Sequence, residues 1–189
     1  MVINWEEQWA SFAKGFKDGK AHIDLTPFGG ASTLQLLPGP GFGDLSHQTT
    51  YLMLQLMGSL VKDKSILDIG CGSGILALSA LLLGAKSAIG VDIDPEAIAH
   101  AQKNAALNNL PATFSDKIPA QTFDIALMNM ITSEQQVVLG QKIDASIWIV
   151  SGILTTQKKQ YITEAASRGW NLLQQAHRGE WLGLVFQTM

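Results

Sequence analysis

The chain has 189 residues, 47% of them hydrophobic and 15% charged, and its formal net charge is -3. This length suffices for one domain with a sizeable core, and the apolar content excludes an intrinsically disordered chain. The small negative charge gives no general attraction to nucleic acid. The single cysteine, Cys71, excludes an intramolecular disulfide. The N-terminus lacks a signal-peptide pattern, and the most apolar stretch is too short to span a bilayer. We therefore expect a cytoplasmic protein without membrane contact.

The first part of the chain carries four aromatic residues at helical spacing: Trp5, Trp9, Phe12 and Phe16. Side chains at this spacing lie on one face of a helix. We expect residues 1–26 to form an N-terminal helical segment whose aromatic face packs on the core. The alternative is a docking face for a partner. Residues 27–189 then form the main domain.

Strands and helices alternate through the main domain. Ser46 is a candidate N-cap for a first helix, which follows a loop rich in glycine and proline at residues 38–43. Helices are predicted at 47–61, 74–83, 95–108 and 155–168, and strands at 65–69, 87–92, 112–115, 123–128 and 146–150. Two closing segments, 171–176 and 181–186, predict a terminal antiparallel pair. The alternation predicts an α/β fold with a doubly wound, mostly parallel, seven-stranded sheet.

A glycine-rich loop follows the first strand of this sheet. Its sequence is D-I-G-C-G-S-G, from Asp68 to Gly74, with glycines at alternate positions 70, 72 and 74. Glycines there allow a tight turn and let a ligand approach the backbone closely. The next helix points its free N–H groups at the same place. In an open α/β sheet, ligands bind at this carboxyl edge.

The spacing of the glycines indicates which ligand binds. A dinucleotide fingerprint has its third glycine one residue later than Gly74. Asp68 suits the ammonium group of S-adenosylmethionine better than a pyrophosphate. Asp92 ends the second strand, 22 residues after Gly70, where a carboxylate can accept hydrogen bonds from ribose hydroxyls. The alternative is a glycine turn needed only for packing, with Asp92 a solvated strand end. We interpret Cys71 as a small residue tolerated in the loop.

Longer motifs carry a resemblance to a known family. Residues 67–80, L-D-I-G-C-G-S-G-I-L-A-L-S-A, and 90–98, G-V-D-I-D-P-E-A-I, look like class I methyltransferases. More narrowly, the chain resembles the PrmA family, which methylates a ribosomal protein of the large subunit. The supporting stretches are P-G-P-G-F-G-D-L-S-H-Q-T-T at 38–50, M-N-M-I at 128–131, S-G-I-L at 151–154 and the late E-W at 180–181.

The resemblance implies a fold, a cofactor and a set of site residues. It implies a class I methyltransferase catalytic domain at residues 27–189 and S-adenosyl-L-methionine as cofactor. Asn129 would be the catalytic residue, at the mouth where an acceptor nitrogen arrives. With the glycine loop added, the expected cofactor-binding residues are Thr50, Asp68, Gly70, Gly72, Gly74, Asp92 and Asn129. No metal site is expected.

Departures from the family pattern leave the acceptor open. Full-length members carry a separate N-terminal substrate domain, and this chain begins just past it, so we expect poor methylation of the ribosomal protein by this chain alone. Asp44-Leu45-Ser46 and Met130 also replace family residues. A protein N-methyltransferase is favoured, with a ribosomal or other protein as substrate. The alternatives are a small-molecule methyltransferase and a non-catalytic cofactor-binding or interaction module; an NAD-dependent dehydrogenase is more distant.

Two further side chains have open roles. His47 either orients a ligand or caps a helix. Asp116 either lies near the adenine amine or is an exposed turn residue. Asp124 is expected to be a solvated strand end.

Overall fold

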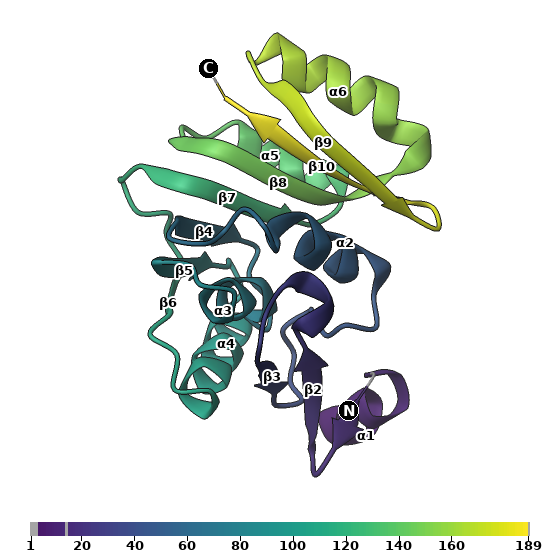
Figure 1. The fold of residues 1–189 in the computed structure, drawn as a ribbon, viewed down its shortest axis with the longest axis vertical. Helices are drawn as coiled ribbons and strands as arrows, with labels where there is room; N and C mark the ends of the chain where they lie inside the picture. Colours follow the sequence, from purple (N-terminus) through teal and green to yellow (C-terminus); the bar gives the residue numbers. More distant parts are fainter. Residues whose placement is uncertain (1–3, 14, 189) are drawn as a thin grey trace.

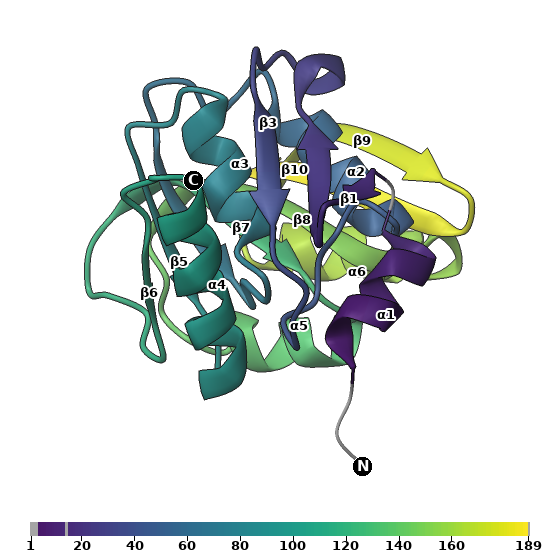
Figure 2. The same ribbon diagram turned by 90° about the horizontal axis from the view of Figure 1, so that it is seen from below.

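The computed structural model describes residues 4–13 and 15–188, and its centre is a seven-stranded sheet (Figures 1 and 2). The strand order is β6-β5-β4-β7-β8-β10-β9. The first five of these strands pair in parallel, and the last two are antiparallel. Their bounds are β4 (Ser65–Ile69), β5 (Ser87–Val91), β6 (Thr113–Ser115), β7 (Phe123–Asn129), β8 (Ala145–Leu154), β9 (Asn171–Arg178) and β10 (Trp181–Gln187). The predicted fold class is confirmed.

Helices cover both faces of this sheet, as Figure 1 shows. One face carries α2 (Gln48–Met57), α3 (Ile75–Leu82) and α4 (Pro95–Leu107), and the other carries α5 (Thr132–Leu139) and α6 (Lys158–Ser167). Successive strand residues point to opposite faces. In β4, Ile66 therefore joins the core under α2 and α3, while Leu67 joins the core under α6.

The N-terminal segment differs from the helix predicted for it. Helix α1 (Trp5–Phe12) is followed by β1 (Phe16–Lys17), β2 (Lys20–Asp24), a 3-10 turn and β3 (Thr33–Leu36), and these strands form a small antiparallel sheet. The prediction of one aromatic helical face was wrong: Trp9 is buried, Phe12 is 68% exposed, and Phe16 lies in a strand. Positive φ angles at Gly15 and Gly19 turn the chain into this sheet.

Two local details also differ from the sequence-based expectation. The N-cap of α2 is His47, whose Nδ1 accepts the N–H of Thr49, and Ser46 instead bonds Asp44 in a turn. Helix α5, between β7 and β8, was not predicted. Its apolar residues form no continuous stripe, and Val137 is 71% exposed.

Polar side chains on α4 fix the loop that leads from β3 to α2. Strand β3 lies beside α3 and α4 (Figure 2). The buried Asn104 accepts the N–H of Leu37 at 2.8 Å and donates to the carbonyl of Ser73 at 2.9 Å. His100 accepts the N–H of Gly41 and donates to the carbonyl of Leu37. Burial lowers the pKa of His100, which keeps the ring neutral. These bonds place the loop directly over the start of α3.

Within the described residues, no helix combines the length and the apolar character that a membrane crossing needs.

Replacing Asn104 tests this anchor. Asn104→Leu leaves the amide of Leu37 and the carbonyl of Ser73 without partners, so we expect a loss of about 2–4 kcal/mol in the free energy of unfolding. Urea denaturation measures it, with the exposed neighbour Lys103→Ala as control. Equal stability of the two variants would contradict the anchoring role.

Candidate functional site

The glycine loop after β4 is held by neighbouring backbone. Gly70, Gly72 and Gly74 all have left-handed backbone, with φ of 70°, 54° and 80°. The N–H groups of Gly70 and Cys71 both donate to the carbonyl of Val91, at 2.8 and 3.0 Å. Residues other than glycine rarely adopt this left-handed backbone conformation. The loop therefore has one fixed conformation at the carboxyl edge of the sheet.

A second loop lies across the first. The N–H of Ser73 donates to the carbonyl of Phe42 at 2.8 Å, and the Ser73 hydroxyl donates to the carbonyl of Gly43. A Cβ on Gly72 would overlap the Phe42 carbonyl. The glycine- and proline-rich stretch found in the sequence thus packs backbone to backbone on the glycine loop.

The other two glycines face different neighbours. A Cβ on Gly70 would overlap the terminal methyl of Met130, which follows β7. A Cβ on Gly74 would lie 3.0 Å from the Phe114 ring and 3.1 Å from the Ala101 Cβ. Gly74 therefore has a packing role at the start of α3, whereas Gly70 faces the open edge of the sheet.

A buried carboxylate lies beneath the glycine loop. Asp68 is 1% exposed, and its Oδ2 accepts the N–H of Ala77 at 3.0 Å. Its Oδ1 has no hydrogen-bond partner in the described part of the chain. Burial raises the pKa of Asp68 to about 7; the Ala77 N–H opposes this shift, and the charge of Asp92 adds to it. The hydroxyl of Thr50, on α2, is also buried and unpartnered among these residues. Buried polar atoms without partners are rare in native proteins.

Asp92 directly follows β5 and anchors the backbone around it. One oxygen accepts the N–H of Gly72 at 2.9 Å, and the other accepts the N–H of Asp94 at 3.0 Å. The interpretation as a mere solvated strand end is wrong, because the half-buried carboxylate holds the glycine loop. Each carboxylate oxygen keeps a second lone pair for a further donor. The next residue, Ile93, is 96% exposed and offers an apolar surface beside Asp92; sequence reasoning missed it, although an aliphatic residue between two aspartates was visible.

Asn129 ends β7 at the same edge of the sheet. It pairs with Ser151 of β8 and is half-buried. Within the described part of the chain, no hydrogen bond involves its side-chain amide, which leaves that amide free for a ligand.

Aromatic rings surround His47 beside this edge. Its ring lies edge-on to Phe42, with centroids 5.6 Å apart, and to Trp181, 5.3 Å apart. The capping interpretation of His47 is confirmed by its bond to Thr49. Sequence reasoning did not single out Phe42, whose role depends on this contact between distant segments.

Three other residues have clear surroundings. Cys71 is buried, and burial raises the pKa of its thiol far above the usual range, so it is not a thiolate nucleophile. Asp116 is exposed after β6. Asp124 lies at the start of β7 with its side chain 42% exposed, as expected for a solvated strand end. It also accepts both the N–H and the hydroxyl of Ser65, which ties β7 to β4 and lowers the pKa of Asp124. Among the described residues, no cluster of three or more His, Cys, Asp or Glu could hold a metal ion.

Comparison with known proteins gives one consistent answer. The family model described as "Ribosomal protein L11 methyltransferase (PrmA)" matches residues 4–189. A protein named ribosomal protein L11 methyltransferase from Teredinibacter turnerae is 36% identical over 95% of this chain and 64% of its own length. One of the same name from Haemophilus influenzae is 36% identical over 94% of this chain and 65% of its own length. The chain thus spans just under two thirds of these relatives.

The fold of a solved relative agrees. The crystal structure of a ribosomal protein L11 methylase from Lactobacillus delbrueckii subsp. bulgaricus superposes with a TM-score of 0.71 at 30% identity, covering 82% of this chain and 86% of that one. Because the family model spans almost the whole sequence and the fold agrees with that of a solved relative, the chain belongs to the ribosomal protein L11 methyltransferase (PrmA) family.

Proposed function

We propose that this chain binds S-adenosylmethionine at the carboxyl edge of β4, β5 and β7 and methylates an amine of a protein. The observation that carries the proposal is the unpartnered, buried oxygen of Asp68 beneath the pinned glycine loop. A buried carboxylate oxygen needs a donor or a cation. The α-ammonium group of S-adenosylmethionine supplies both.

The surrounding residues fit the rest of that cofactor. The second lone pairs of the Asp92 oxygens suit ribose hydroxyls. The exposed side chain of Ile93 gives an apolar surface for an adenine ring. The unpartnered Thr50 hydroxyl gives one more polar contact. We propose that Gly70 serves binding through close backbone approach, whereas Gly72 is covered by Phe42 and, like Gly74, shapes the loop.

The cofactor supplies an electrophilic methyl group on a sulfonium sulfur. The protein's contribution is orientation and exclusion of water. The free Asn129 amide oxygen accepts an N–H of the incoming amine and so directs the nitrogen lone pair. Phe42, His47 and Trp181 form an aromatic cluster, and we propose that this cluster limits the access of water to the acceptor. The amine reaches the site neutral, after it has lost its proton to solvent.

Ribosomal protein L11, which the relatives' name specifies, is the first acceptor to test. A small-molecule acceptor or a purely cofactor-binding role are the competing functions. Three incubations with methyl-labelled cofactor distinguish these functions. The chain is mixed with purified L11, with the protein fraction of a lysate, or with the small-molecule fraction of a lysate. Label confined to small molecules would overturn the protein acceptor, and absence of label in all three would favour a non-catalytic module.

Cofactor binding gives a direct prediction. We expect S-adenosylhomocysteine to bind in the micromolar range, about -8 kcal/mol, by calorimetry. Asp92→Ala should weaken it by roughly 1.5–3 kcal/mol, because charge-assisted hydrogen bonds are lost. The control is Asp144→Ala, an exposed position just before β8 at the amino edge of the sheet. Binding of NADH in place of S-adenosylhomocysteine would contradict the proposal.

The ionisation of Asp68 gives a second prediction. Its folded pKa of about 7 lies above its value in an unfolded chain, so the folded state favours the protonated form. The free energy of unfolding should therefore fall as the pH rises from 5 to 8, and Asp68→Asn should remove much of this fall. Urea denaturation at both pH values measures it. An equal pH dependence in both proteins would show that Asp68 does not titrate in this range.

Asn129 gives a third prediction. Asn129 is also expected to contact the cofactor, so Asn129→Ala should weaken S-adenosylhomocysteine binding by up to about tenfold. Beyond that loss it should lower kcat for methylation at saturating cofactor about 100-fold, because a misplaced nucleophile reacts slowly. Steady-state assays with the acceptor identified above measure kcat. An unchanged kcat would remove Asn129 from the catalytic role.

A further inference from the structure

A buried side chain of α5 forms a hydrogen bond to the loop that follows Asn129. Gln135 is fully buried. Its Nε2 donates to the carbonyl of Met130 at 2.6 Å and to the carbonyl of Ser151 at 2.8 Å. Both hydrogens of the amide are thus used, one on the loop after β7 and one on the neighbouring β8. Gln135 therefore fixes the loop relative to the sheet.

Tyr161, on α6, orients this amide. Its hydroxyl donates to Oε1 of Gln135 at 2.5 Å, and it is 5% exposed. Burial raises the pKa of Tyr161 above its ordinary value, so the hydroxyl keeps its proton. A proton donor at Oε1 leaves Nε2 facing the two carbonyls. The Tyr161 hydroxyl, the Gln135 amide and the two carbonyls thus form one uncharged network, in which both hydrogens and the oxygen of the amide are hydrogen-bonded.

The opposite side of the Met130 carbonyl is closed by Gly152. A Cβ on Gly152, whose φ is 84°, would overlap that carbonyl. The Met130 side chain in turn lies over Gly70 of the glycine loop. The network thus holds Met130, which directly follows Asn129 in the chain and whose side chain contacts Gly70 of the glycine loop.

We propose that Gln135, oriented by Tyr161, is a positioning residue that sets Met130 over the glycine loop and aims Asn129 at the acceptor. The consequence for catalysis rests on the proposed function. Gln135 and Tyr161 lie outside every motif through which the chain resembles its family. Their role comes from hydrogen bonds that join α6 to α5, and α5 to the loop after β7 and to β8.

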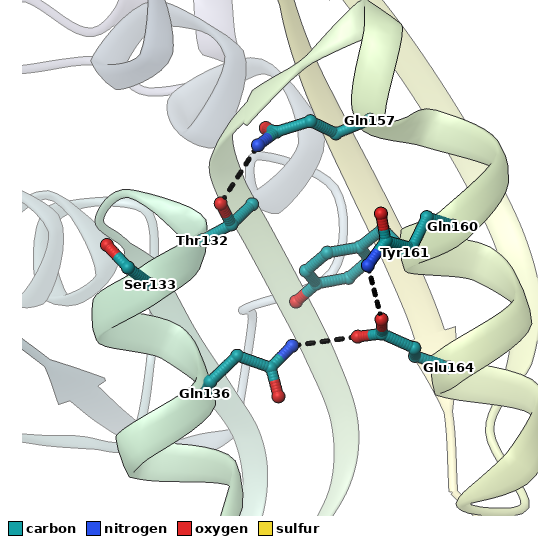
Figure 3. Close-up of a pocket in the computed structure, with 7 residues that line it drawn as sticks. All are labelled: Thr132, Ser133, Gln136, Gln157, Gln160, Tyr161 and Glu164. Carbon is teal, nitrogen blue, oxygen red and sulfur yellow. Dashed lines mark hydrogen bonds between the residues drawn. The ribbon is translucent and has the colours of Figure 1, made fainter.

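The surface above this network supplies matched controls. Figure 3 shows Tyr161 reaching from α6 toward α5, beside a cavity of about 180 Å³. Nearer the surface, Glu164 accepts hydrogen bonds from Gln136 and Gln160, each at 2.8 Å. Glu164→Gln and Gln160→Ala alter this outer layer and leave Gln135 with all of its partners.

The first test reads the position of Met130 without any cofactor. The chain has six methionines, and methyl-13C labelling gives each a separate NMR signal, with that of Met130 assigned by Met130→Leu. In Gln135→Leu and in Tyr161→Phe we expect the Met130 methyl signal to move toward the position of a free side chain, more in the first variant. Glu164→Gln should leave it in place. A Met130 signal unchanged in Tyr161→Phe and in folded Gln135→Leu would overturn the proposal. Tyr161→Phe alone decides the question if Gln135→Leu does not fold.

The second test separates positioning from general stability. In Tyr161→Phe and Gln135→Leu we expect kcat to fall about 10-fold to 100-fold, while KM for the acceptor changes less than about threefold. Gln160→Ala should match the unaltered chain. A rise in KM with unchanged kcat would overturn the proposal. If the unaltered chain neither binds S-adenosylhomocysteine nor transfers methyl groups, the proposed function fails, and the Met130 signal still decides whether Gln135 positions the loop.

Discussion

The left-handed turn of the backbone at Gly70, Gly72 and Gly74 is the constraint on which the rest of the site depends. Left-handed backbone costs an ordinary residue about 1–2 kcal/mol, and a side chain at Gly72 would also strike the carbonyl of Phe42. Only with this turn do the N–H groups of the loop reach Val91 and Asp92. The same turn brings the buried start of α3 to the carboxyl edge of the sheet, beneath the loop that carries Phe42. One short segment thus fixes the place that we propose for the cofactor.

Asp68, at the end of β4 just before the turn, is buried where a carboxylate weakens the fold. One of its oxygens is satisfied by Ala77, while the other has no partner in the described structure. A core built only for stability would carry an apolar residue there, because an unpaired buried carboxylate is costly. Perturbed buried groups of this kind concentrate at functional sites. A cation beside the carboxylate would remove this cost, so in the proposed function the same oxygen would link cofactor binding to the stability of the fold.

The sequence predicted the strands and site residues that short stretches of neighbouring residues are enough to identify. Strands β4, β5 and β7 are short apolar runs bounded by turn residues, and Asp68, Gly70 and Asp92 follow from the spacing of one motif. Two parts could not be predicted in this way. Strand β2 is defined by its pairing with β1 and β3, and α5 buries Gln135 in place of an apolar stripe. Met130 escaped notice as a contact of Gly70 because that contact depends on how distant segments pack.

Side-chain amides fix the two loops of the site from opposite faces of the sheet. On one face, Asn104 of α4 holds the carbonyl of Ser73 in the glycine loop. On the other, Gln135 of α5 holds the carbonyl of Met130 in the loop that begins at Asn129. An amide can satisfy buried carbonyls without bringing a net charge into the core, so it orders backbone at a lower desolvation cost than Lys or Arg. The two loops meet where Met130 lies over Gly70. A displacement of either amide therefore reaches both the place proposed for the cofactor and the place proposed for the acceptor, because a packed contact transmits it.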